Sequence, residues 1–243
     1  CKARQVTVLI LTLHEKFAVL SQDTIISDTR AIEKQPALGV ATDEEEQRRS
    51  AFVGDGSPPK DRVGLGQQSK ITIAPHVQLI AGYSGRCHWM TQWDIVARNA
   101  PVRDVVELHA MIPQLVRTCD RNLSGEGSTA VHVGWSPTDR RMRGFLYSSQ
   151  NQWTGMELPK GHCLYPACDP DDSDYDKVLA LAAKASAGEA VEEFHLALAM
   201  NIHRAFLRGR YIKGAIIGGQ LHTVRVDAEC ITARVAHVFD LGG

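Results

Sequence analysis

The stretch KITIAPHVQLIAGYSG, residues 70–85, decides how the sequence is interpreted. Its apolar and β-branched residues favour short strands over residues 71–73 and 77–81. The second strand leads into AGYSG, residues 81–85, whose two glycines predict a turn, and helix-like sequence follows over residues 87–98. A glycine turn in this position can bind a phosphate, support an oxyanion or merely reverse the chain. The rest of the sequence has to decide between these three roles.

The composition limits the classes of function. A chain of 243 residues can bury a sizeable core, and its 44% apolar and 23% charged residues argue against a disordered or membrane protein. The formal net charge of -1 gives no support for binding nucleic acid or a membrane surface, so we expect neither partner. Six cysteines are scattered without a CxxC pair, which predicts reduced thiols in a cytoplasmic protein.

Strands and helices are predicted in alternating groups. An apolar hairpin is expected over residues 6–26, with its turn at 14–16, and residues 27–68 are expected to form a long surface insertion because they are charged and rich in glycine and proline. Further helices are predicted over residues 102–121, 174–186 and 189–207, and further strands over residues 130–135, 144–148, 152–158, 214–218, 221–226 and 231–239. Helices that come in pairs between groups of strands predict antiparallel sheets between two helical layers, in one domain of residues 1–243.

Three short motifs in this order resemble the proteasome-type N-terminal-nucleophile (Ntn) hydrolases, the family of proteasome β subunits and of the bacterial proteasome-like peptidase subunit. AVLSQD, residues 18–23, is similar to the family's second strand, which ends in a buried aspartate. Residues 69–71 are similar to its lysine strand, and IAGYSG, residues 80–85, to the glycine turn that opens its first helix. The resemblance implies an α+β fold of the Ntn-hydrolase type, a four-layer αββα sandwich.

The resemblance also implies a threonine-type endopeptidase. In this family an N-terminal threonine attacks a peptide carbonyl while its own α-amine, which titrates near pH 8, accepts the proton. Asp23 would orient Lys70 and keep it charged, and Lys70 would favour deprotonation of the hydroxyl. A backbone N–H at Gly85 would stabilise the oxyanion. On this hypothesis the quoted turn is an oxyanion loop, or the relic of one.

The nucleophile has two candidates. The family's spacing from Asp23 leads back to Thr7 in QVTVLI, but six residues precede Thr7, so it has a free amine only after processing. Val6 stands where family precursors usually have glycine. Cys1 is the alternative nucleophile, because a terminal cysteine also combines a thiol with an α-amine.

The other candidate residues also have ordinary structural interpretations. Asp23 can simply accept hydrogen bonds at the end of a strand. Lys70 can be a solvated lysine on an edge strand, and Gly82 and Gly85 can serve only the turn.

The resemblance carries expectations about partners as well. It implies a homo-oligomeric ring or spiral that hydrolyses unfolded polypeptide inside its chamber, served by an ATP-dependent unfoldase, with no cofactor and no metal. One alternative is a catalytically inactive proteasome-fold subunit that acts as a structural or binding module. The other is an Ntn amidohydrolase acting on a small amide, which predicts a monomer or dimer with an enclosed pocket.

Overall fold

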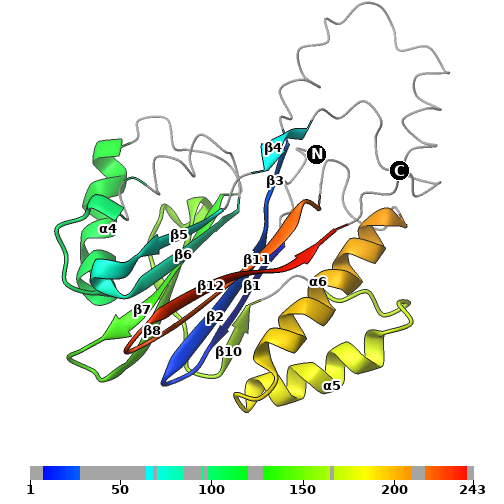
Figure 1. The fold of residues 1–243 in the computed structure, drawn as a ribbon. Helices are drawn as coiled ribbons and strands as arrows, with labels where there is room; N and C mark the ends of the chain where they lie inside the picture. The colour runs from blue at the N-terminus through cyan, green and yellow to red at the C-terminus, as the bar shows by residue number, and fades with distance from the viewer. Residues whose placement is uncertain are drawn as a thin grey trace, which may run out of the picture.

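The computed structural model describes residues 8–27, 64–67, 70–84, 95, 98–119, 128–164, 167–208 and 217–239. Two five-stranded antiparallel sheets dominate this part of the chain (Figure 1). A separate pair of short strands, β3 (Ile25–Ser27) and β4 (Gly64–Gln67), extends from the end of one sheet. The predicted insertion at 27–68 lies, apart from these strand residues, outside the described residues.

The first sheet has the strand order β10-β1-β2-β11-β12. Its strands are β1 (Leu9–Leu13), β2 (Phe17–Asp23), β10 (His162–Leu164), β11 (Gln220–Asp227) and β12 (Ile231–Val238). The predicted hairpin is confirmed: β1 and β2 pair antiparallel with Leu13 opposite Ala18, and the turn is closed by the N–H of His14 on the carbonyl of Phe17 at 2.9 Å. Strand β10 lies between residues 158 and 174, where the sequence predicted no helix or strand.

The second sheet has the strand order β5-β6-β7-β8-β9. Its strands are β5 (Ile71–Ala74), β6 (Leu79–Ser84), β7 (Thr129–Ser136), β8 (Arg141–Ser148) and β9 (Met156–Glu157), and the 3-10 turns η1 (Pro75–Val77) and η2 (Ser149–Asn151) join neighbouring strands. The predicted glycine turn at residues 81–85 is wrong in its first part, because β6 continues through Gly82 to Ser84. Gly82 is a strand residue opposite Ile71 and Val131.

Three α-helices have bounds within the described residues: α4 (Val105–Cys119), α5 (Tyr175–Ser186) and α6 (Val191–Leu207). Asp104 caps the start of helix α4, because its Oδ1 accepts the N–H groups of Val106 and Glu107 at 2.9 Å each. Helix α4 contains Pro113 and packs on the second sheet, whereas α5 and α6 pack together on the first sheet (Figure 1). No helix in the described ranges is both long and apolar enough to cross a membrane.

These helices correct the predicted layers. The α+β class is observed, but the four-layer αββα sandwich of the Ntn-hydrolase type is not: the described residues form two antiparallel sheets with α4 alone against one of them. The predicted companion of α4, residues 87–98, lies outside the described residues apart from 95 and 98. The helical pattern of a sequence predicts a helix and its apolar side, but it does not predict the sheet against which the helix packs. The layers of the fold could therefore not be derived from it.

The alternation of side chains along the strands builds three cores. Leu20 of β2 belongs to the core between the sheets, together with Ile80 and Val133 of the second sheet. Val19, one residue away, faces the opposite core under α5 and α6. A third core fills the space between α4 and the second sheet. Strand β2 is therefore buried on both faces, so any polar side chain on it needs a partner inside the protein.

Candidate functional site

A buried ion pair joins the two sheets at one end of the molecule. Asp23 is the last residue of β2, and Lys70 immediately precedes β5. The Lys70 Nζ lies 3.2 Å from both carboxylate oxygens of Asp23. The Asp23 side chain is fully buried and that of Lys70 is 6% exposed. The interpretation of Lys70 as a solvated edge lysine is therefore wrong.

Asp23 also holds the start of the described chain. The N–H of Val8 donates to Asp23 Oδ1 at 2.9 Å, and the N–H of Asp23 donates to the carbonyl of Val8 at 3.3 Å. Val8 is fully buried and directly follows Thr7 in the sequence. One carboxylate thus contacts both the Lys70 ammonium and the residue after the predicted nucleophile. The structural interpretation of Asp23, as an acceptor of hydrogen bonds at a strand end, is therefore correct but incomplete, because Asp23 also pairs with Lys70.

Three of the predicted site residues lie outside the described residues, namely Thr7, Gly85 and the alternative nucleophile Cys1. The structure brings together Asp23 and Lys70, which are 47 residues apart in the sequence. The catalytic roles of all five residues stay predictions.

Gln22 is a buried polar residue of this site that the sequence analysis missed. Its side chain is 1% exposed and bridges from β2 to the backbone of Tyr83 in β6. Its Oε1 accepts the N–H of Tyr83 at 3.3 Å, and its Nε2 donates to the Tyr83 carbonyl. A signal was present, because Gln22 follows Ala18 and Leu20 at the period of two that marks the apolar face of β2.

Strand β11 closes the site from the other side. The backbone N–H of Gln220 donates to the hydroxyl of buried Thr24 at 2.9 Å, and His222 lies opposite Gln22 in the strand register. Partial burial lowers the pKa of His222, and its Nε2 lies 3.0 Å from the side-chain oxygen of Gln220. The end of β2 and the residue after it are thus polar over four successive buried residues, Ser21, Gln22, Asp23 and Thr24.

A second polar cluster surrounds His195 of α6. Its Nε2 lies 2.9 Å from the hydroxyl of Thr12 and its Nδ1 lies 2.8 Å from that of Ser21, which in turn contacts the hydroxyl of Thr223 at 2.7 Å. Burial lowers the pKa of His195 to about 3, so the ring is neutral near pH 7. Although Ser21 and His195 resemble a nucleophile and its base, both are 0% exposed and no substrate can reach them. This network ties α6 to the first sheet.

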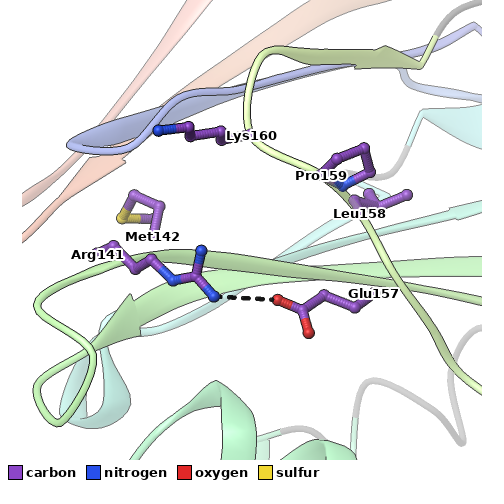
Figure 2. Close-up of a pocket in the computed structure, with 6 residues that line it drawn as sticks. All are labelled: Arg141, Met142, Glu157, Leu158, Pro159 and Lys160. Atoms are coloured by element: carbon purple, nitrogen blue, oxygen red, sulfur yellow. Dashed lines mark ion pairs between the residues drawn. The ribbon is translucent and has the colours of Figure 1, made fainter.

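The structure has a surface hollow at the other end of β1. It encloses about 300 Å³ between Arg141, Met142, Glu157, Leu158, Pro159 and Lys160 (Figure 2). Figure 2 shows Arg141 directed toward Glu157, at 3.6 Å, and Lys160 lies 3.7 Å from Glu15 of the β1–β2 turn. These charged side chains are exposed and form ordinary surface ion pairs, so the hollow is not the candidate catalytic site.

Comparison with known proteins finds a solved structure of similar fold but shows no family for this chain. No family model and no curated protein matches the chain. Among solved structures, the chain is similar to an Anbu (Gly-1) mutant from Hyphomicrobium sp. strain MC1, with a TM-score of 0.57 and 12% identity, covering 96% of this chain and 89% of that chain. Anbu is a proteasome-like protein.

The comparison corrects the family assignment made from the sequence motifs. At 12% identity the similarity shows a shared fold alone. Membership of the proteasome-type Ntn hydrolases, as proteasome β subunit or bacterial proteasome-like peptidase subunit, is therefore wrong as an assignment. The assignment rested on three short motifs. Strands with the same burial pattern also occur in unrelated chains, so such motifs do not establish a family. What the comparisons establish is a fold similar to that of proteasome-like Anbu.

Proposed function

We propose that this chain is a threonine-type peptidase in which Thr7, freed by removal of residues 1–6, is the nucleophile and Asp23 and Lys70 assist it. The observation that carries the proposal is the double contact of the Asp23 carboxylate, which binds the Lys70 ammonium at 3.2 Å and the N–H of Val8 at 2.9 Å. Because Thr7 is covalently joined to Val8, the same carboxylate would hold both the nucleophile's neighbour and the cation that activates it.

The buried position of the pair suits this chemistry. A lysine beside a carboxylate in a low-dielectric environment stays charged, and its charge favours a nearby alkoxide over a hydroxyl. The Thr7 hydroxyl would attack a peptide carbonyl and pass its proton to the Thr7 α-amine, which then protonates the departing amine. Water would hydrolyse the resulting ester and restore Thr7. The N–H of Gly85 would bind the oxyanion in both steps.

The substrate and assembly belong to the same proposal. The fold similarity to Anbu, a proteasome-like oligomeric protein, supports a homo-oligomer. The finer proposal is a ring or spiral that cleaves unfolded polypeptide inside a chamber, with an ATP-dependent unfoldase as a partner. An amidohydrolase acting on a small amide would use the same residues on a different substrate. A fluorogenic peptide and a small acyl amide, tested side by side, distinguish the two.

The decisive experiment is intact-mass analysis of untagged native protein, followed by an assay with a fluorogenic peptide. We expect a mass that lacks residues 1–6, cleavage of the peptide, and loss of cleavage to background in Thr7→Ala while its unfolding temperature is unchanged. Cys1→Ala is the matched control, since it alters the alternative nucleophile and should leave cleavage intact. Retention of residues 1–6, or full activity in Thr7→Ala, would contradict the proposal.

One observation favours a second candidate function. Val6 stands before Thr7 instead of the glycine expected at a self-cleaved bond, which favours an unprocessed chain. Such a chain would be a non-catalytic subunit that serves as a structural or binding module. It would show the unprocessed mass, no cleavage of either substrate, and assembly that is unaffected by Thr7→Ala.

A further inference from the structure

We propose that Gln22 is a positioning residue of the site, which fixes the end of β6 relative to the Asp23–Lys70 pair. The proposal rests on the peptidase function proposed above. Strand β2 carries Asp23, and β6 ends at Ser84, just before Gly85. The two strands belong to different sheets, so no ladder of backbone hydrogen bonds sets the distance between them. Side chains have to do so: the apolar core between the sheets sets their spacing, and Gln22 adds the polar contact from β2 to the backbone of β6.

The Gln22 amide makes the contact that a neighbouring strand would make. Its oxygen accepts the N–H of Tyr83 and its nitrogen donates to the carbonyl of the same residue. The register of β5 with β6 ends at the pair Ile71–Gly82, so Tyr83 is the first residue of β6 beyond that ladder. A glutamine amide carries an acceptor oxygen and a donor NH2 group side by side on one planar unit, so it can pair with both the N–H and the carbonyl of one residue from the opposite sheet.

Gly82 provides the space for this bridge. A Cβ at residue 82 would lie 2.7 Å from the Cδ1 of Leu9, 3.0 Å from the Cδ2 of Leu20 and 3.2 Å from the Oε1 of Gln22. The missing side chain therefore lets β2 and β6 approach closely enough for the amide to reach the Tyr83 backbone. This gives Gly82 a physical role that differs from the predicted turn.

The position of Gln22 explains why the bridge matters for chemistry. Gln22 and Asp23 are adjacent in one strand, so the same rigid backbone carries the carboxylate and the amide that holds Tyr83. Two residues beyond Tyr83 the chain reaches Gly85, the proposed oxyanion donor. Oxyanion stabilisation requires donors within a few tenths of an ångström of their ideal positions, and a shift of about 1 Å costs on the order of 10²-fold in rate.

Gln22→Glu tests the proposal through pH. An ionised carboxylate accepts from the Tyr83 N–H but repels its carbonyl, whereas a protonated carboxyl can accept and donate as the amide does. Within the described ranges, the charged and titratable groups around residue 22 are Asp23 and Lys70 at the end of the strand and His222 on β11. We expect kcat of Gln22→Glu to fall 10- to 100-fold at pH 8, with KM little changed, as an order-of-magnitude range. The ratio of its kcat to that of the unaltered protein should rise as the pH is lowered to 5.5.

Two further variants separate positioning from simple packing. Gln22→Leu should lose kcat to a similar extent with no dependence of the ratio on pH. Leu20→Ala is the matched control, because Leu20 is fully buried on the same face of β2 and its side chain has no hydrogen-bonding group. It should lower the unfolding temperature and leave kcat unchanged. If both Gln22 variants keep their kcat and only lose stability as Leu20→Ala does, the proposal is overturned.

Hydrogen exchange makes the test independent of the proposed function. In Gln22→Leu the amide of Tyr83 should exchange at least tenfold faster, whereas in Leu20→Ala it should change no more than its neighbours. If the unaltered protein cleaves nothing, the peptidase function fails on its own, and this selective exchange still supports Gln22 as the residue that holds β6. Unchanged protection of Tyr83 in Gln22→Leu overturns the proposal whether or not the protein is active.

Discussion

The carboxylate of Asp23, the last residue of β2 in the first sheet, lies 3.2 Å from the ammonium nitrogen of Lys70, the residue before β5 of the second sheet. Both side chains are nearly inaccessible to solvent, so each ion compensates part of the hydration that the other has lost, and the N–H of Val8 adds to this at Asp23. A pair of this kind is a costly way to join two sheets if joining is its only purpose. Apolar residues of similar size would pack there at least as well.

Breaking this pair from one side should destabilise the protein strongly. Lys70→Met leaves the Asp23 carboxylate buried without the ammonium, so we expect the free energy of unfolding to fall by about 3–5 kcal/mol. The double variant Asp23→Leu/Lys70→Met should cost clearly less than the sum of the single changes. Denaturant unfolding of the four proteins measures the coupling. A fall below about 1 kcal/mol in Lys70→Met would show that the pair is not compensated in the way described.

Gly134 should not tolerate a methyl group. A Cβ at this residue would lie 2.8 Å from the carbonyl oxygen of Gln78, and backbone atoms cannot move aside as a flexible side chain can. We expect Gly134→Ala to lower the free energy of unfolding by about 1–3 kcal/mol. Gly161→Asn is the control, since a Cβ at Gly161 would meet nothing within 4 Å and asparagine accepts its φ of +75°. Equal losses in the two variants would contradict this explanation.

His195 should make the protein sensitive to acid. Burial holds the folded-state pKa of this residue near 3, whereas an unfolded histidine titrates near 6.5. Below pH 6.5 the unfolded state binds a proton that the folded state refuses, so stability falls as the pH drops from about 6.5 toward 3, by up to about 1.4 kcal/mol per pH unit. Above pH 6.5 the residue contributes no pH dependence.

Replacing His195 should flatten this slope. In His195→Gln the free energy of unfolding should depend less on pH between 6.5 and 5, whatever the variant's stability at pH 7. His76 is exposed, so His76→Gln should leave the slope unchanged and serves as the control. The buried His132, whose pKa is also lowered to about 3, contributes a slope of its own and is kept in both variants. The same slope in all three proteins would argue against a neutral buried His195.

Arg204 should anchor the segment that precedes α5. Its Nε and Nη2 donate to the two carboxylate oxygens of Asp172 at 2.8 and 2.6 Å, and this contact holds the pKa of Asp172 well below its usual range. A lysine has a single charged nitrogen and cannot form the paired contact. We expect Arg204→Lys to cost about 1–2 kcal/mol at pH 7. Because the Asp172 pKa is lowered on folding, this difference should shrink as the pH falls below about 4, when the unfolded carboxyl is protonated.

Proteolysis offers a second measurement of the same anchor. Limited digestion should cut Arg204→Lys between β10 and α5 sooner than the unaltered protein. Lys184→Arg, a change on the exposed side of α5, is the control and should leave the digestion pattern unchanged. Identical patterns for Arg204→Lys and the unaltered protein would contradict the proposed role of the contact.

The β1–β2 hairpin and helices α4, α5 and α6 were predictable from the sequence because local patterns specify them. An apolar period of 3.6 and a polar turn between apolar runs are properties of short segments. The same local rules failed at Gly82, which they place in a turn. Its surroundings, Leu9 and Leu20, are far away in the sequence, and they explain the glycine in a strand.

The candidate site was predictable only where a motif marked it. Asp23 and Lys70 were proposed from a resemblance, and their contact spans 47 positions that no periodicity connects. Gln22 lay inside one of the quoted motifs and was passed over, because its partner is the backbone of Tyr83 and a backbone group leaves no trace in the sequence. Strand β10 has three residues, too few for a strand pattern to be recognised.

The pairing of strands β3 and β4 determines how freely the length of the sequence between them can change. Ser27 pairs with Gly64 in their antiparallel register, so the chain leaves and re-enters the described structure at a single point. The two large sheets therefore place no requirement on the number of residues between these positions, since the entropy of closing a loop grows only slowly with its length. A short turn could replace the intervening segment and a foreign domain could be inserted there. The β3–β4 pair is therefore a position at which the protein can gain or lose a whole segment or domain while its three cores stay the same.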